Sequence, residues 1–145
     1  MYARVPSGIA AEIVKFNPGG GAGEIHMEPG YDSMNFLRPE TVESLHIMHY
    51  VTRNASYQDM GWEIFTKWEK HAWVGTGGYT MLNDVKQVPP PKGDKMESFF
   101  LSETLKYLFL LFEDPEKPAV SLRDYVFNTE GHPLPIWEFD ANKFS

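Results

Sequence analysis

The chain has 145 residues, of which 42% are hydrophobic, so it is long enough to bury a core and too apolar to be disordered. Its net charge of −7 argues against a nucleic-acid-binding protein, which needs a basic face. It has no cysteine, which excludes disulfides and thiolate chemistry. No run reaches the ~18 apolar residues of a membrane span. The N-terminus has no secretory signal or other targeting segment.

Apolar residues recur at helical spacing in three segments, at about 39–52, 57–72 and 95–112. The first opens at Pro39, a favoured first helical position, and Val42, Leu45 and Met48 share one face. In the second, Met60, Ile64 and Trp68 recur at intervals of four residues. The third ends in LKYLFLLF, which is apolar almost all round and is expected to be buried on most sides.

Two further segments have the composition of extended structure. TGGYTMLNDV, at 76–85, predicts a strand or hairpin, and the tail DYVFNTEGHPLPIW has strand formers before Asn128 and prolines after it. Helices joined by short extended segments predict a mainly helical, layered assembly rather than an α/β sheet.

The stretch LRPETVES places two carboxylates, Glu40 and Glu43, near one face of the first helical turn. Carboxylates at this position stabilise the positive end of a helix by ~0.3–1 kcal/mol each, so a structural role explains them. The alternative is a functional carboxylate on a rigid helix start, with Arg38 beside it to hold a substrate or tune its charge.

The stretch KMESFFLSETLKY places Glu103 on an otherwise apolar face with Phe99 and Tyr107. Burying an ionised carboxylate is costly unless it is paired. Glu103 therefore either forms an ion pair with Lys106 or another base, or belongs to a site in which the flat ring of Phe99 supports a sugar.

The stretch VFNTEGHPLPI is either a structural hairpin that plugs a cavity or a site built on Thr129 and Glu130. Thr129 offers a hydroxyl and a carbonyl oxygen and Glu130 a carboxylate, which suit a hard cation, although there are too few carboxylates for an EF-hand loop. The histidines lack metal-binding spacing, and no Gly-x-Ser-x-Gly motif occurs. Paired carboxylates with aromatic rings are typical of sugar hydrolysis.

One N-glycosylation motif, Asn54-Ala55-Ser56, is an acceptor only in a secretory lumen, and isolated motifs of this kind are frequent by chance.

Several long strings, in order, resemble the C-terminal part of class I α-1,2-mannosidases, glycoside hydrolase family 47. They are AEIVKFN, LRPETVESL, YQDMGWEIF, GGYTMLNDV, DKMESFFLSETLKYLFLLF and YVFNTEGHPLPIW. The resemblance runs from about Ala11 to Trp137, and DKMESFF is closest to the endoplasmic reticulum type.

The resemblance implies a mainly α fold, part of an (α/α)7 barrel that a C-terminal β-hairpin closes as a plug. It implies Ca²⁺-dependent, inverting removal of terminal α-1,2-linked mannose from high-mannose N-glycans on glycoproteins, in the lumen of the endoplasmic reticulum or Golgi.

The resemblance also implies roles for individual residues. Glu40 corresponds to the catalytic base that activates water, and Arg38 and Glu43 line the same site. Phe99 corresponds to the ring beneath the sugar and Glu103 to the acid beside it.

In the last string, Thr129 corresponds to the direct Ca²⁺ ligand, through its hydroxyl and carbonyl oxygens. Glu130 corresponds to a carboxylate that binds sugar or ion-bound water. Gly131 stands where the family usually has Ala.

On this resemblance residues 1–145 form a single partial domain, whose partner would be the N-terminal half of the barrel. That half supplies the general acid, so the isolated chain is expected to be inactive and to expose apolar helix faces. Two alternatives are a non-catalytic relative that binds Ca²⁺ and mannose like a lectin, and a nonfunctional remnant.

Overall fold

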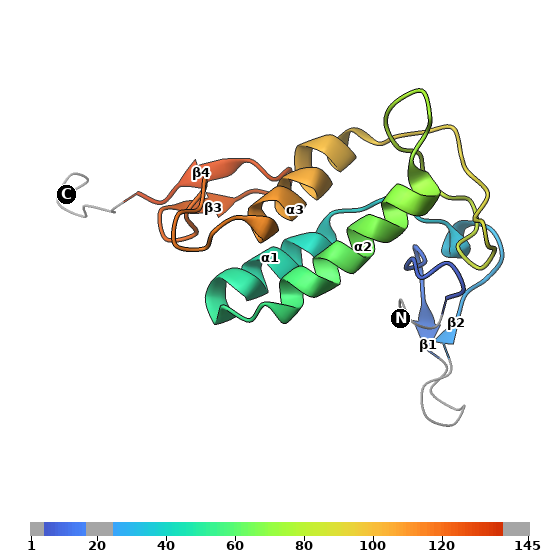
Figure 1. Cartoon of the computed structure of the whole chain (residues 1–145), viewed down its shortest axis with the longest axis horizontal. Coiled ribbons are helices and arrows are strands. Elements are labelled where there is room, and N and C mark those ends of the chain that lie inside the picture. The colour runs from blue at the N-terminus through green and yellow to red at the C-terminus, as the bar shows by residue number, and fades with distance from the viewer. Residues whose placement is uncertain (1–4, 17–24, 138–145) are drawn as a thin grey trace, which may run out of the picture.

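A computed structural model describes residues 5–16 and 25–137 of the chain, which is mainly helical, as predicted (Figure 1). In chain order the elements are strands β1 (Lys15–Phe16) and β2 (Ile25–His26), the 3-10 turn η2 (Tyr31–Ser33), helices α1 (Glu40–Thr52) and α2 (Ser56–Ala72), the π-helical turn η3 (Phe100–Thr104), helix α3 (Leu105–Phe112), and strands β3 (Tyr125–Phe127) and β4 (Pro133–Pro135).

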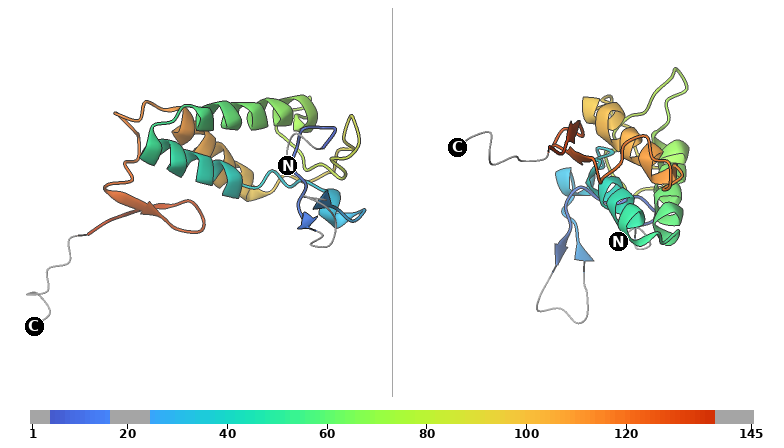
Figure 2. Two further views of the ribbon diagram at one scale, coloured as in Figure 1. Left: turned by 90° about the horizontal axis from the view of Figure 1, so that it is seen from below. Right: turned by 90° about the vertical axis from the view of Figure 1, so that its left-hand side faces the viewer.

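The three helices pack on one another and form the body of the molecule. α1 and α2 lie side by side, joined by a short turn, and α3 packs against both (Figures 1 and 2). The turn begins at Arg53, whose φ of 58° ends α1 and whose backbone N–H donates to the carbonyl of His49. The periodicity of the first two segments therefore predicted both helices to within one residue.

The predicted buried faces are confirmed for Val42 on α1 and for Ile64 and Trp68 on α2, and are wrong for one methionine on each helix. On α1, Val42, His46 and His49 are buried, whereas Met48 is 42% exposed. On α2, Gly61 is buried and Met60 is 50% exposed, because the side chain of Leu111 from α3 lies directly against Gly61. A Cβ at Gly61 would lie 2.4 Å from that side chain, so this glycine permits the close approach of α2 and α3.

The predicted start of the third helix at Lys95 is wrong, because helical geometry begins at Ser98. The backbone of Lys95 is extended and bonded elsewhere: its carbonyl accepts the N–H of Met81, and its N–H donates to the hydroxyl of Thr80. The expected burial of LKYLFLLF on most sides is also wrong, since Phe109 is 63% exposed.

Segment 76–85 forms isolated bridges instead of a regular strand or hairpin. Tyr79 pairs with Trp73, and Leu82 pairs with both Asn35 and Lys92. Gly77 and Gly78 have positive φ angles, which interrupt an extended strand. Leu82, with no exposed surface, nevertheless ties this loop to the core.

At the C-terminal end of the described chain, β3 and β4 form an antiparallel hairpin in which Val126 pairs with Leu134. Both of these side chains are exposed, and Phe127 is the hairpin residue that packs against the core. Its ring lies 5.4 Å from that of Tyr107 and 6.5 Å from that of His46. The hairpin is thus attached to α1 and α3 at one edge.

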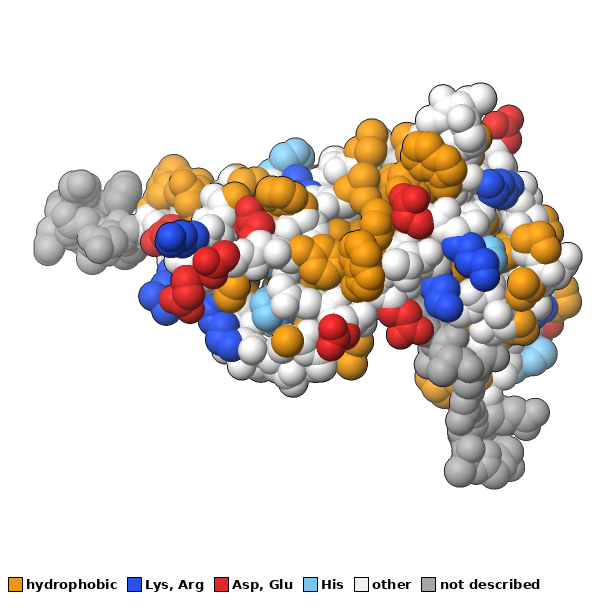
Figure 3. All heavy atoms as spheres, viewed as in Figure 1, with side chains coloured by type: hydrophobic (Ala, Val, Ile, Leu, Met, Phe, Trp, Pro, Cys, Tyr) orange, Lys and Arg blue, Asp and Glu red, His pale blue; other side chains and the backbone are white. Residues whose placement is uncertain are grey.

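Hydrophobic side chains remain exposed over the helical body, where they gather above α2 and α3 (Figure 3). The large exposed ones on these helices are Met60, Trp62, Phe109 and Phe112. Trp62 and Phe112 contact each other edge to face, with ring centres 5.9 Å apart. An apolar surface of this kind is typical of a protein interface.

Candidate functional site

Three segments that are distant in the sequence meet beside the N-terminal end of α1. They are the entry to α1 at residues 35–43, the π-helical turn η3 with the residues before it, and the turn between β3 and β4 at residues 128–132. All seven residues that the sequence singled out as site candidates lie on these segments.

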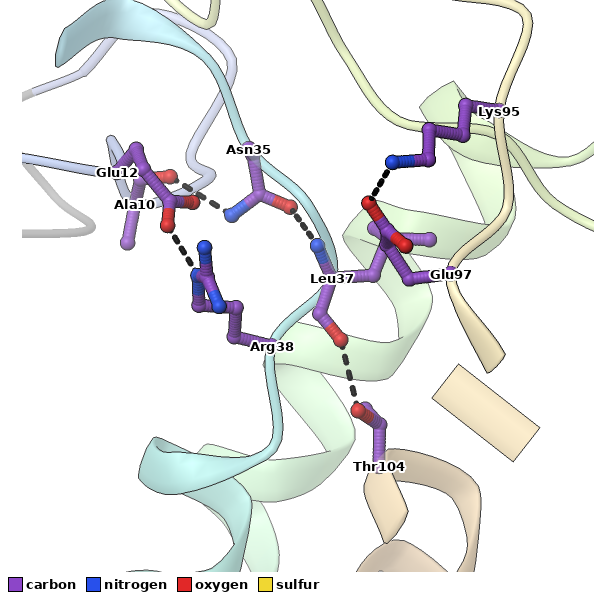
Figure 4. A network of polar contacts seen from close by, with 8 residues as sticks. All are labelled: Ala10, Glu12, Asn35, Leu37, Arg38, Lys95, Glu97 and Thr104. Atoms are coloured by element: carbon purple, nitrogen blue, oxygen red, sulfur yellow. Dashed lines mark hydrogen bonds and ion pairs between the residues drawn. The ribbon is translucent and has the colours of Figure 1, made fainter. Parts of the chain in front are cut away.

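The entry to α1 is held by buried hydrogen bonds (Figure 4). Leu37 is buried with a φ of 60°, a left-handed conformation that costs a non-glycine residue roughly 1–2 kcal/mol. Its N–H donates to the side chain of Asn35 at 3.0 Å, and its carbonyl accepts the hydroxyl of Thr104 at 2.7 Å. Asn35 in turn donates to the carbonyl of Ala10 at 2.9 Å. These bonds hold the strained residue that sets the direction of the helix start.

Arg38, which follows this strained residue, forms an ion pair with Glu12 (Figure 4). The hydrogen bond that Arg38 donates to the Glu12 carboxylate raises the pKa of Arg38. The guanidinium also lies 5.6 Å from the ring centre of Phe99 and 5.5 Å from that of Phe36. Arg38 and Phe99 are therefore in contact, as a shared site requires.

Glu12 is the site residue that sequence reasoning missed. Its side chain is only 8% exposed, and within the described residues it forms an ion pair with Arg38 alone. The signal available in the sequence was a single carboxylate in the otherwise apolar stretch from Ile9 to Val14.

The four candidate carboxylates influence one another. Glu103 is 8% exposed, and burial raises its pKa, as do the negative charges of Glu130, Glu40 and Glu43, in that order. Glu43 accepts a hydrogen bond from the hydroxyl of Tyr107 at 3.2 Å, and burial together with Glu43 raises the pKa of that hydroxyl. The carboxylates therefore concentrate negative charge at one place.

Of the two alternatives for Glu103, the ion pair with Lys106 is not formed. Lys106 donates instead to the carbonyl of Gly131 at 2.6 Å, and its charge lowers the pKa of Glu103 only as the smallest of several influences. Within residues 5–16 and 25–137, no ion pair joins Glu103 to a basic side chain. A buried carboxylate beside three others is typical of a site and not of a structural salt bridge.

The π-helical turn carries Glu103 and is a feature that the sequence pattern did not predict. Such turns insert one extra residue into a helix and are frequent at functional sites. Here the turn lets the hydroxyl of Thr104 donate to the carbonyl of Leu37, while Glu103 faces the hairpin turn.

The turn between β3 and β4 lies directly against Glu103. The side chain of Asn128 shapes it by accepting the N–H groups of Glu130 at 3.0 Å and His132 at 2.9 Å. Gly131 is buried with a φ of 67°, and a Cβ there would lie 3.1 Å from Cγ of Glu103. Thr129 and Glu130 are left exposed at the tip.

The donor groups of this site fit a hard cation. They are oxygens only, and the mutual repulsion of the carboxylates around Glu103 is relieved by a positive charge. Across the described part of the chain, no three His, Asp or Glu side chains converge closely enough to hold an ion by themselves. A bound Ca²⁺ would therefore be held by Thr129 and an adjacent carboxylate, with water or ligand hydroxyls completing its coordination.

Comparison with known proteins identifies the relatives of the chain. The family model of glycosyl hydrolase family 47 matches residues 1–136. The endoplasmic reticulum mannosyl-oligosaccharide 1,2-alpha-mannosidase of Homo sapiens is 51% identical over 141 residues, which cover 94% of this chain and 20% of the human protein. The protein of the same name from Schizosaccharomyces pombe is 43% identical over 148 residues, covering 100% of this chain and 28% of its own length.

Among solved structures, the alpha-1,2-mannosidase from Trichoderma reesei is similar to this chain, with a TM-score of 0.65 and 37% sequence identity. The match covers 73% of this chain and 22% of the fungal one. The chain thus spans about a fifth to just over a quarter of the length of these relatives.

Proposed function

The chain belongs to glycosyl hydrolase family 47, and we propose that it forms the C-terminal portion of the catalytic barrel of an α-1,2-mannosidase. The whole protein would hydrolyse terminal α-1,2-linked mannose from high-mannose N-glycans, with inversion at the anomeric carbon. The proposed compartment is the lumen of the endoplasmic reticulum, because relatives at 51% and 43% identity are named for it.

One observation carries this proposal. The negative charges of Glu130, Glu40 and Glu43 raise the pKa of Glu103, although the four residues come from three separate segments. Carboxylates that repel one another are typical of functional sites, and carboxylate clusters beside an aromatic ring are typical of glycosidases. Phe99 supplies the ring, since it is half-buried and contacts Arg38.

Glu40 is the proposed general base. It is exposed in the first turn of α1, where the buried Pro39 and the strained Leu37 fix the backbone direction. Its carboxylate takes a proton from a water whose oxygen bonds to the anomeric carbon as the bond to the glycosidic oxygen breaks. The leaving oxygen takes its proton from an acid on the opposite face, which we assign to no residue of this chain.

The remaining candidates bind the sugar in this proposal. The ring of Phe99 lies under the apolar face of mannose, and Arg38, Glu43, Glu103 and Glu130 hydrogen-bond its hydroxyls. Burial and the neighbouring carboxylates raise the pKa of Glu103.

Ca²⁺ is the proposed cofactor, with the hydroxyl and carbonyl oxygens of Thr129 as its direct protein ligands. The ion would bind mannose hydroxyls and favour a distorted ring. Thr129 suits this role because it is exposed at the tip of a turn that Asn128 and Gly131 hold against the carboxylates.

The hairpin is proposed to act as the plug of an (α/α)7 barrel whose other helices lie outside this chain. The exposed Trp62, Phe109 and Phe112 support this arrangement, since an apolar surface over α2 and α3 is suited to packing against further helices. The N-terminal half of the barrel is then the partner of this chain.

A chimaera tests the enzymatic proposal. Residues 1–136 replace the matching segment of the human relative, which is 51% identical, and mannose release from a high-mannose glycan is measured. We expect activity that Glu40→Gln lowers at least ~10³-fold, as for removal of an essential catalytic group. Glu116→Gln, at an exposed position outside the site, is the control. The 145 residues alone should release no mannose.

Calorimetry tests the ion site independently of turnover. Ca²⁺ is titrated into the chain and into Thr129→Ala, with Thr76→Ala as a control in another exposed loop. We expect binding to be lost only in Thr129→Ala. Equal affinity in both variants would contradict the assignment of Thr129.

A further inference from the structure

We propose that Asn54 is an N-glycosylation site, which the chain presents at the turn between α1 and α2. The motif Asn54-Ala55-Ser56 has the required hydroxyl residue at the third position and no proline at the second. The proposal rests on the proposed function only through the compartment, because the modification takes place in the secretory lumen.

The turn presents Asn54 to solvent. Asn54 and Ala55 are both exposed and Ser56 is partly exposed. The turn lies at an outer end of the helical body in Figures 1 and 2. Surface turns are the expected location of this motif.

The hydrogen bonds of Asn54 leave its reactive atom available. Its Oδ1 accepts the N–H of Ser56 at 3.0 Å, its N–H donates to the hydroxyl of Thr52 at 3.3 Å, and its carbonyl bonds to Nδ1 of His49 at 3.0 Å. No hydrogen bond within residues 5–16 and 25–137 uses its Nδ2. That nitrogen can therefore be substituted without breaking a bond that shapes the turn.

The reaction needs a sugar donor, namely a polyprenyl pyrophosphate that carries an oligosaccharide. Nδ2 of Asn54 forms a bond to C1 of the first sugar, and the bond from C1 to the phosphate oxygen breaks. The pyrophosphate leaves with the electron pair, and Nδ2 gives one proton to a base of the transferase.

The position is compatible with the candidate site. Glu40 is the first residue of α1 and Asn54 follows its last, so the two lie at opposite ends of a helix whose 13 residues span about 20 Å. The residues beside the motif, Arg53 and Asp59, are exposed and charged, unlike the apolar surface over α2 and α3. Because of the length of α1, a glycan at Asn54 would lie away from the candidate site.

The experiment expresses the whole chain behind a cleavable signal sequence in a eukaryotic secretory host. A short C-terminal tag with its own acceptor motif reports entry into the lumen. We expect two glycans on the wild type, which an amidase that removes N-glycans reduces to none, with conversion of Asn54 to Asp detected by mass spectrometry. A chain with a glycosylated tag and an unmodified Asn54 would overturn the proposal.

Three variants separate modification from folding. Ala55→Pro keeps Asn54 and Ser56 but blocks transfer, and the φ of −64° at Ala55 already suits proline. Ser56→Ala removes the hydroxyl, and Ser56→Thr retains it. We expect one glycan in the first two variants and two in the third. A second glycan that persists in Ala55→Pro and Ser56→Ala would also overturn the proposal.

The outcome is distinguishable from failure of the proposed function. The signal sequence delivers the chain to the lumen whatever its activity, and Ca²⁺ titration of the same samples reports on Thr129. If the chain is modified at Asn54 but binds no Ca²⁺, the proposal for the glycan site is supported and the proposal for the cofactor is contradicted. The opposite pattern overturns only the glycan site.

Discussion

The helical body and the C-terminal hairpin are held together by different contacts. The helices enclose fully buried side chains, of which Tyr107 and Leu111 are examples. The hairpin leaves most of its side chains exposed, including Leu134 at 48%, and contacts the body through Phe127 and Gly131. Because an isolated two-stranded hairpin is marginally stable, the hairpin depends on the body while the body does not depend on the hairpin.

The candidate site lies across this boundary. Glu40 and Glu103 belong to the body, whereas Thr129 and Glu130 belong to the hairpin. A ligand that contacts both regions therefore helps to hold the marginally stable hairpin on the helical body. Changes in the body should unfold the chain, and changes in the hairpin should alter the site while the helices persist.

The largest expected effect is in the core of the body. Leu111→Ala removes a side chain with no exposed surface and should lower the free energy of unfolding by about 2–5 kcal/mol. Leu134→Ala, the matched change in the hairpin, should lower it by less than about 0.5 kcal/mol. Urea denaturation followed by far-UV circular dichroism measures both. Similar losses in the two variants would remove the distinction between the regions.

The next effect concerns His46, whose ring meets that of Phe127 edge to face where the hairpin contacts α1. Burial lowers the pKa of His46 to about 4, with a smaller contribution from His49, while a backbone hydrogen bond to Leu110 acts in the opposite direction. The unfolded chain, with a pKa near 6.5, therefore binds a proton that the folded chain does not bind between about pH 6.5 and 4. Stability due to neutral His46 is complete above this range and falls by roughly 3 kcal/mol at its lower end.

His46→Phe should remove this pH dependence. The free energy of unfolding is measured in urea at pH 7 and pH 4.5 for the wild type and the variant. Subtracting the pH-induced change of the variant from that of the wild type cancels the titration of other groups. His132→Phe, at an exposed position in the hairpin turn, is the control. An unchanged dependence in His46→Phe would show that another group causes acid unfolding.

A smaller effect, confined to the hairpin, is expected for Gly131→Val. The φ of 67° costs a residue with a Cβ roughly 1–2 kcal/mol, and the new Cβ would lie 3.1 Å from Cγ of Glu103. Valine branches at this Cβ, unlike the alanine that the family usually has here, so we expect the helical circular dichroism to persist while Ca²⁺ affinity falls. Gly75→Val is the control, because a Cβ there meets nothing within 4 Å. Equal affinities in the two variants would separate the ion site from the geometry of the turn.

Local patterns predicted the helices because periodicity within one segment is a property of adjacent residues. They predicted most of the buried face, including Ile64 and Trp68, but missed Gly61, which is buried against Leu111 from another helix. They also missed the π-helical turn, which is stabilised by the bond from Thr104 to Leu37, 67 residues away.

The sequence proposed candidate residues for the site but not their assembly. Glu40, Glu103 and Thr129 became candidates through the resemblance of their strings to the family, and they stay a prediction, whereas the repulsion that acts on Glu103 arises only when three segments fold together. Glu12 was missed for the same reason, because only its partner Arg38, 26 residues away, gives that carboxylate a role.

The smallest and sharpest effect is expected for Glu103→Gln. Because burial and neighbouring carboxylates raise the pKa of Glu103, its ionised form destabilises the folded chain at neutral pH. The extra stability of the protonated form is present below the unfolded pKa and is lost as the pH rises through the folded pKa. At pH 7 without Ca²⁺, glutamine should therefore raise the free energy of unfolding by about 1 kcal/mol or less.

Bound Ca²⁺ should make the wild type more stable than Glu103→Gln, because the negative charge of Glu103, which repels Glu130 and Glu40, attracts the ion. Thermal unfolding of the wild type and Glu103→Gln, with and without saturating Ca²⁺, measures the inversion, and Glu63→Gln on the exposed side of α2 is the control. If glutamine remains the more stable residue in Ca²⁺, the ion does not lie near Glu103. The hairpin turn would then be placed against this carboxylate by the contacts of Gly131 and Lys106 alone.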